Sequence, residues 1–180
     1  MSKLPVPVEF RLPEGWEPVR PEEWGVENAA FMAVRRETPG GYVPILSISG
    51  DWRLDYTTLD SIADESVALA QAQADQVEIL DRREIGSEEA PAILQLLGVS
   101  ATIDGRPWEL RQGQVLSGLV DLKDPSRRVV VIYTVTCSAE QFDVVGREFQ
   151  AFMSTVRPVA PDGSSGTEGA DSPGSAGPTG

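Results

Sequence analysis

The 180-residue chain contains no histidine and a single cysteine, Cys137. Without histidine, it lacks the commonest general base, the usual partner of a serine or cysteine nucleophile and the commonest metal ligand. Cys137 ends an apolar, β-branched run, so we expect a small buried thiol rather than a nucleophile. Glycine-rich phosphate loops are also absent from the sequence. We therefore predict a protein that is not an enzyme and has no cofactor and no metal site.

The sequence also lacks long apolar runs. No run approaches the 18 apolar residues that a membrane-spanning helix needs, so we predict no membrane insertion. The first residues, MSKLPVPVEFRLPEGW, contain no apolar core of a signal peptide. A single cysteine permits no disulfide within the chain, in keeping with a reducing compartment. These features predict a cytoplasmic protein.

Positive charge is scarce, with 15 Lys and Arg residues against 28 Asp and Glu residues and a formal net charge of −13. Nucleic acids and anionic membranes are polyanions, so this charge disfavours both as partners. It suits a basic partner instead. We expect a protein partner with a basic or hydrophobic segment and no nucleic acid.

The last 22 residues, 159–180, contain no aromatic residue, no Leu, Ile or Met, and no positive charge. Such a segment cannot bury enough apolar surface to offset the entropy of ordering it. We predict a disordered Gly/Ser/Pro-rich acidic tail at 159–180 and a single domain over 1–158.

Within that domain, alternating and β-branched runs predict strands, and apolar residues at 3.6-residue spacing predict helices. A helix is expected to begin at Thr57 or Thr58 and end at Asp75, with a second from Ser138 to Pro158. Asp104-Gly105 predicts a tight hairpin turn, and Gly113 a bulge or bend. Strands are expected at 6–12, 29–36, 42–49, 77–85, 90–103, 108–122 and 128–137, with a loop at 18–24.

Side-chain spacing also predicts the buried faces. The first helix is expected to pack through Leu59, Ile62, Ser66, Leu69, Ala70 and Gln73, and the second through Phe142, Val145, Phe149, Phe152 and Met153. Val77, Ile79 and Ile85 are expected to point inward. The run of hairpins gives an α+β domain, an antiparallel sheet of about six to seven strands with two main helices packed on it.

The N-terminal PVEFRLPEGW and the closing AEQFDVVGREFQAFMSTVRP, together with this element order, resemble the Mog/PsbP-like fold. The closing pattern is similar to that of small bacterial DcrB-like and LpqN-like proteins. Members include photosystem II subunits, a Ran-GTPase-binding protein, bacterial lipoproteins and chaperone adaptors of type VI secretion. The resemblance implies a non-enzymatic protein-binding module, an adaptor or chaperone-like protein. The alternative is a small-molecule or lipid carrier, with a cavity between the sheet and the second helix.

Two groups of side chains are candidates for partner binding. Between Leu54 and Asp81 there are seven carboxylates and no Lys or Arg, which is typical of a solvated helix face or of a docking face for a basic partner. The tryptophans lie near turns and strand ends, where they cap the core or form exposed contact points. The candidate partner-binding residues are Trp52, Tyr56, Trp24, Trp108, Asp60 and Asp64.

Overall fold

The computed structural model describes residues 4, 7–26, 28–38, 40–54, 57–88, 90–120 and 127–158. The predicted tail at 159–180 and the candidate residue Tyr56 lie outside these ranges. The helices are η1 (Pro21–Trp24, a 3-10 helix), α1 (Leu59–Gln73) and α2 (Phe142–Met153). The strands are β1 (Val8–Glu9), β2 (Glu17–Val19), β3 (Phe31–Val34), β4 (Ile45–Leu54), β5 (Gln76–Gly86), β6 (Pro91–Ile103), β7 (Arg106–Val120), β8 (Arg127–Ser138) and β9 (Arg157–Pro158).

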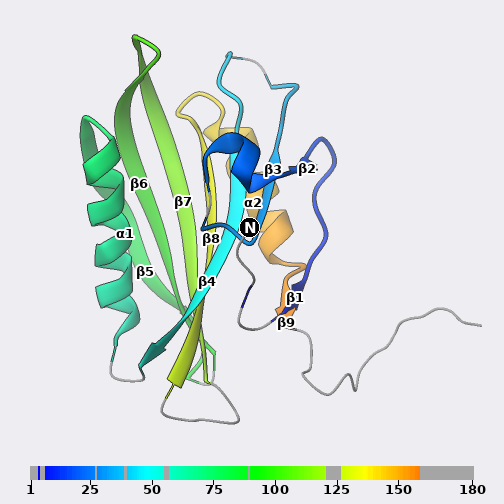
Figure 1. The fold of residues 1–180 in the computed structure, drawn as a ribbon, viewed down its shortest axis with the longest axis vertical. Coiled ribbons are helices and arrows are strands. Elements are labelled where there is room, and N and C mark those ends of the chain that lie inside the picture. The colour runs from blue at the N-terminus through cyan, green and yellow to red at the C-terminus, as the bar shows by residue number, and fades with distance from the viewer. Residues whose placement is uncertain are drawn as a thin grey trace, which may run out of the picture.

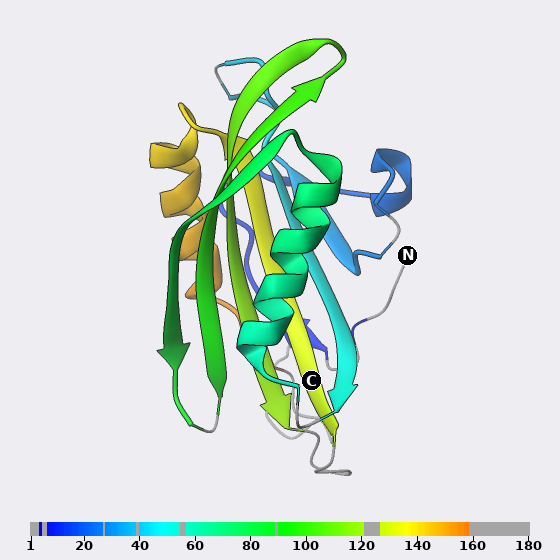
Figure 2. The ribbon, with the colours of Figure 1, turned by 90° about the vertical axis from the view of Figure 1, so that its left-hand side faces the viewer.

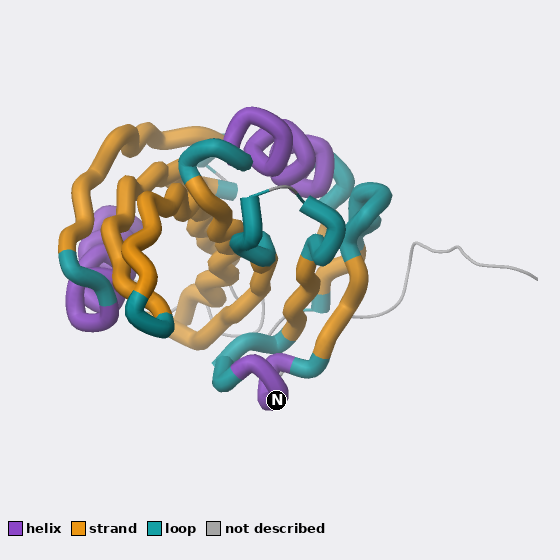
Figure 3. The backbone as a smooth tube through the Cα atoms, turned by 90° about the horizontal axis from the view of Figure 1, so that it is seen from above, coloured by secondary structure: helices purple, strands orange, loops and turns teal. Residues whose placement is uncertain are grey.

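Seven strands form one antiparallel sheet in the order β2-β3-β4-β8-β7-β6-β5 (Figure 1). The helices α1 and α2 lie on opposite sides of this sheet (Figure 3). We call these sides the α1 face and the α2 face. This architecture confirms the predicted α+β class, the sheet of six to seven strands and the two main helices.

The α2 face carries the larger apolar core. In β8, Val129, Val131, Tyr133 and Val135 are buried there together with Leu46 and Ile48 of β4. The predicted face of α2 covers them: Val145, Phe149 and Phe152 are buried, and Phe142 and Met153 pack against the same core. Alternation along each strand places every second side chain on this face.

The α1 face is covered by a set of α1 residues that agrees with the prediction at Leu59, Ile62 and Ala70 and differs from it elsewhere. The helix buries Leu59, Ile62, Ala63 and Val67, whereas Leu69 is 64% exposed. Small residues at the contact bring the helix close enough for the Ala63 carbonyl to accept a hydrogen bond from Gln95 Nε2 of β6, at 3.4 Å. The buried side of α1 therefore does not include Leu69.

The N-terminal segment differs most from the prediction. Instead of a strand over 6–12, only Val8–Glu9 is a strand, and it pairs with Arg157–Pro158 after α2. The predicted loop at 18–24 contains part of β2 and all of η1. Two-residue and three-residue strands are too short to show an alternating pattern, so periodicity does not reveal them.

The irregularity in the sheet lies in β5 rather than at Gly113. The register of β7 is regular against both neighbours, so the bulge predicted at Gly113 is wrong. A Cβ at Gly113 would lie 3.3 Å from Val135, so the residue serves close packing. The register of β5 shifts between Ile79 and Asp81. Beside this bulge Ile79 is 46% exposed, and Ile85 is 40% exposed rather than inward.

Several local signals at element ends are confirmed, although the second helix begins at Phe142 rather than at the predicted Ser138, which ends β8. The Thr58 hydroxyl accepts a hydrogen bond from Ser61 N at 3.1 Å and caps α1. Ser138 and Gln141 form the reciprocal bonds of a capping box before α2, Ser138 N to Gln141 Oε1 at 2.9 Å and Gln141 N to Ser138 Oγ at 3.3 Å. Asp104 and Gly105 both have positive φ, as the predicted hairpin turn requires.

Candidate functional site

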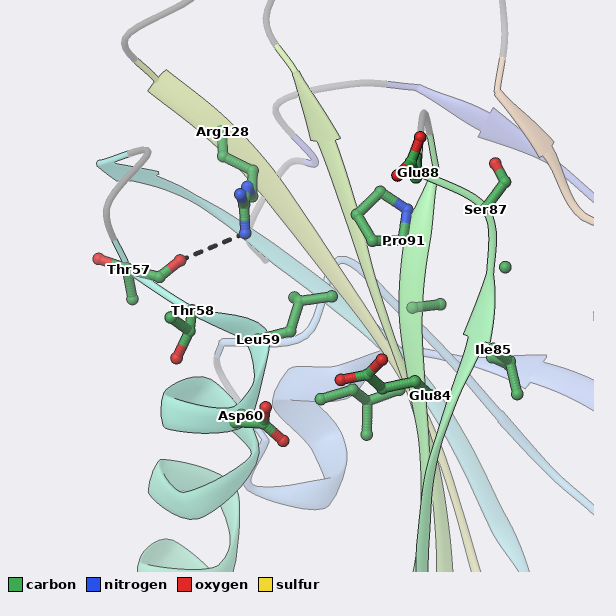
Figure 4. Close-up of a pocket in the computed structure, with 13 residues that line it drawn as sticks. Thr57, Thr58, Leu59, Asp60, Glu84, Ile85, Ser87, Glu88, Pro91 and Arg128 are labelled. Atoms are coloured by element: carbon green, nitrogen blue, oxygen red, sulfur yellow. Dashed lines mark hydrogen bonds between the residues drawn. The ribbon is translucent and has the colours of Figure 1, made fainter.

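A pocket of about 690 Å³ opens where α1 begins, between that helix and the β5–β6 turn (Figure 4). Its apolar lining includes Leu59, Ile93 and Pro91. Its acidic lining consists of Asp60 on the first turn of α1, Glu84 on β5 and Glu88 in the turn. The pocket therefore combines apolar side chains with carboxylates from three separate parts of the chain.

The single basic residue among the described lining residues is Arg128, at the start of β8. Its Nη1 donates to the carbonyl oxygen of Thr57 at 3.2 Å, which fixes the segment leading into α1. The Glu84 side chain extends from β5 toward that first helical turn (Figure 4). With three carboxylates against one guanidinium, the pocket favours a cationic group.

The geometry of the two flanking turns is well determined by local bonds. Thr58 caps α1, as described above, and this places Leu59 and Asp60 at the pocket. On the other side, Ala90 N donates to Ser87 Oγ and Ser87 N to the Ala90 carbonyl, both at 3.2 Å. Gly86 has a φ of +82°, and a Cβ there would lie 2.3 Å from the Ala90 carbonyl oxygen. Only glycine fits this turn without strain.

The segment between Leu54 and Asp81 contains carboxylates and no basic residue. Arginines from neighbouring strands partly neutralise it. Arg53 of β4 pairs with Glu65 at 2.6 Å, and this hydrogen bond lowers the pKa of Glu65. Arg82 of β5 pairs with Asp64 at 2.8 Å. Of the two acidic candidates, Asp64 is therefore engaged in attaching α1 to the sheet, whereas Asp60 lines the pocket.

The structure does not bring the candidate tryptophans to this pocket. Trp52 lies in β4 opposite Val129, on the α2 face, and is 37% exposed. Trp24 ends η1, with the Arg36 guanidinium 5.8 Å from its ring centroid. Trp108 lies near the far end of the β6–β7 hairpin, in edge contact with Tyr42. The three candidate tryptophans thus lie apart from one another and from the pocket.

Sequence reasoning missed Glu84, Glu88 and Arg128 as lining residues. A signal was available, because further acidic residues follow Arg82-Arg83, namely Glu84 at the end of β5 and Glu88 in the turn after it. The carboxylates were counted only as far as Asp81, so the acids that follow were left out. The contribution of Arg128 depends on the pairing of β8 within the sheet, which one segment alone does not reveal.

The groups that could carry chemistry are buried or dispersed. Cys137 is fully buried, and desolvation raises the pKa of its thiol to about 12, so it stays protonated at neutral pH. No group of three His, Cys, Asp or Glu residues in the described ranges could hold a metal ion. The rings of Phe149 and Phe152 stack at 6.3 Å within the core of the α2 face, where the carrier hypothesis places its cavity.

Comparison with solved structures identifies the fold. The mycobacterial protein LpqN, involved in cell envelope biogenesis of Mycobacterium tuberculosis, matches with a TM-score of 0.61 at 9% identity over 86% of this chain and 85% of LpqN. Cyanobacterial PsbP (CyanoP) from Synechocystis sp. PCC 6803 matches with a TM-score of 0.55 at 14% identity over 84% of this chain and 86% of that one. The chain has a PsbP/LpqN-like fold.

This result confirms the resemblance drawn from the two terminal motifs and the element order. At such identities the PsbP/LpqN-like likeness concerns the fold alone. No protein-family model matches the sequence, and no curated protein does. None of the described helices is long and apolar enough to cross a lipid bilayer. The predicted cytoplasmic location stays a prediction.

Proposed function

We propose that this chain is a non-enzymatic protein-binding module, adaptor or chaperone-like, that holds a basic and partly apolar segment of its partner in the pocket at the start of α1. The observation that carries the proposal is the amphipathic lining, in which the carboxylates of Asp60, Glu84 and Glu88 occur together with apolar side chains such as Leu59 and Ile93. A lysine or arginine side chain has the matching shape, an aliphatic stem with a charged end.

The remaining charges agree with such a partner. The described acids on the pocket have no strong basic neighbour except Arg128, whose Nη1 is bonded to the Thr57 carbonyl. The whole chain carries a net charge of −13, which attracts basic segments over longer distances and accelerates their association. Its PsbP/LpqN-like fold leaves this pocket at one end of the sheet, away from the main core.

The test is a titration with two synthetic peptides, one of alternating valine and lysine and one of alternating valine and glutamate. We expect the lysine peptide alone to bind, by fluorescence anisotropy, and its affinity to fall as salt is added. The double variant Asp60→Asn, Glu84→Gln should weaken binding about tenfold, because two partly exposed ion pairs contribute about 1.4 kcal/mol together.

The matched control is Asp143→Asn. Asp143 is the first-turn acid of α2, as Asp60 is of α1, so both substitutions remove a favourable charge at a helix N-terminus. Only Asp60 lines the pocket, and Asp143→Asn should leave the affinity unchanged. Equal binding of the two peptides, or no binding of either, contradicts the proposed function.

A further inference from the structure

The two edges of the sheet differ in what they offer to another strand. One edge is β2, with three residues including Pro18, and the other is β5, with eleven residues. Among the described residues no strand pairs with the outer side of β5, which forms the free margin of the sheet in Figure 2. Its sequence, QVEILDRREIG, contains neither proline nor lysine, two residues that commonly protect edges.

The register shows which backbone groups of β5 face outward. The Ser87 N–H donates to the Ala90 carbonyl, so the antiparallel alternation directs Arg83 and Ile85 toward β6. The backbone N–H and C=O groups of Arg82 and Glu84 then point away from the sheet, and the Arg82 N–H donates to the Asp81 carboxylate, which an added strand would have to replace. The bulge between Ile79 and Asp81 ends this regular stretch, which therefore runs from Asp81 to Gly86.

This stretch leads directly into the pocket. Glu84, Ile85 and Gly86 line the pocket and are also the last residues of β5. The side chain of Ile85 is 40% exposed. A strand added along Asp81–Gly86 would form backbone bonds with Arg82 and Glu84 and would bring one of its side chains to the acidic lining.

The charges select the occupant. Arg82 is paired with Asp64 at 2.8 Å and Arg83 with Asp81 at 2.5 Å, so both arginines of the strand are already neutralised. Glu84, Glu88 and Asp60 remain beside the edge. A second copy of this chain would bring the same carboxylates and a further net charge of −13. A basic segment of another protein complements this edge.

We propose that the partner segment binds by β-strand addition, as an extended basic and apolar strand hydrogen-bonded to Arg82 and Glu84 of β5 with one basic side chain in the pocket. This inference rests on the proposed function and specifies its binding mode. Main-chain hydrogen bonds supply affinity in such complexes, and pockets for alternate side chains supply specificity.

Amide hydrogen exchange, followed by NMR, tests the geometry directly. In the free protein the amide of Glu84 should exchange fast and that of Arg82 faster than its neighbours in spite of its bond to the exposed Asp81 carboxylate, while those of Arg83 and Ile85 are protected by β6. Saturation with the valine–lysine peptide should slow exchange at Arg82 and Glu84 at least tenfold. The same peptide N-methylated at alternate residues, which lacks donors on one side, should bind at least tenfold more weakly.

A matched pair of variants separates backbone from charge. Glu84→Pro removes an outward N–H that the sheet does not use, so the fold is retained, and peptide binding should fall at least tenfold below that of Glu84→Gln. Circular dichroism checks that both variants are folded. Dimerisation through this edge, detected by light scattering of the free protein, would overturn the choice of a basic partner.

The outcomes distinguish the two proposals. If the valine–lysine peptide binds but the amides of Arg82 and Glu84 exchange as before, strand addition is overturned and the pocket alone accounts for binding. If Glu84→Pro binds as Glu84→Gln does, the same conclusion follows. If the peptide does not bind at all, the proposed function fails and takes the strand-addition mode with it.

Discussion

The two faces of the sheet are covered by different kinds of buried side chain. On the α2 face, one large apolar cluster extends from Trp16 to Phe152. On the α1 face, two smaller clusters contain Ile62 and Val67 respectively. The side chains of Gln95 and Gln114 are also buried on this face, and Gln95 Nε2 donates to Gln114 Oε1 at 2.8 Å.

The difference indicates that one face mainly stabilises the domain, whereas the proposed binding surface lies beside the other. Burial of large apolar side chains is the main stabilising term of a fold, so the α2 face holds the domain together. The α1 face has smaller apolar clusters and depends more on hydrogen bonds between buried side chains, which stabilise the fold only when every partner is in place. The pocket and the free edge of β5 both lie at the margin of this second face, where a partner can bind without disturbing the main core.

The largest effect should come from truncating the α2 core. Phe152 is fully buried and in edge contact with Phe10 at 5.2 Å and Tyr133 at 6.3 Å. Phe152→Ala should lower the free energy of unfolding by about 3–5 kcal/mol, measured by urea denaturation. Leu69→Ala, on the exposed side of α1, is the control and should change it by under about 0.5 kcal/mol. A loss below about 2 kcal/mol for Phe152→Ala would contradict the central role of this face.

An intermediate effect should follow from breaking the polar ladder on the α1 face. Gln95 is fully buried, accepts from Arg82 Nε at 2.7 Å and donates to Gln114 and to the Ala63 carbonyl. Gln95→Leu leaves these groups without their partner and should cost about 1–3 kcal/mol in urea denaturation.

The double variant Gln95→Leu, Gln114→Leu checks the cause of that loss. It removes one of the groups that the single substitution leaves unsatisfied, so it should recover part of the stability. If the double variant loses more unfolding free energy than the two single variants lose in sum, the loss reflects packing rather than unsatisfied hydrogen bonds.

The comparison of the faces also shows what sequence could predict. Long strands and the α2 stripe were correct because the spacing of Val145, Phe149 and Phe152 is strong and repeated. The α1 stripe was wrong at Leu69 because Ala63 and Val67 complete the buried side instead, and a small residue such as Ala63 gives a weak apolar signal. The bulge at Leu80 and the β1–β9 pair depend on tertiary contacts, since no local residue requires them.

The candidate site was predicted only in part, for the same reason. Asp60 lines the pocket, but Trp52, Trp24 and Trp108 lie elsewhere, because proximity in a sheet follows strand order rather than sequence. Arg128 reaches the start of α1 only because its strand lies inside the sheet. Composition predicts the charge of the proposed partner, and topology is needed to bring the lining residues of the proposed surface together.

The smallest effect should come from the ion pair that joins α1 to β4. Arg53 donates from both terminal nitrogens to Glu65, at 2.6 and 3.2 Å, and this lowers the pKa of the Glu65 carboxyl. Because the folded-state pKa is lowered, the stabilisation is complete above the unfolded value near 4.5 and is lost as pH falls through the folded value. Glu65→Gln should therefore cost about 0.2–1 kcal/mol at pH 7 and nothing at pH 2.

Urea denaturation of the wild type, both single variants and the double variant Arg53→Gln, Glu65→Gln at the two pH values completes the cycle. At pH 7 the coupling energy isolates the pair from the other ion pairs of α1, such as Arg82–Asp64. A coupling that persists at pH 2 would show that the carboxylate charge is not its source. A coupling near zero at both values would mean that the Arg53–Glu65 pair does not help to hold α1 to the sheet.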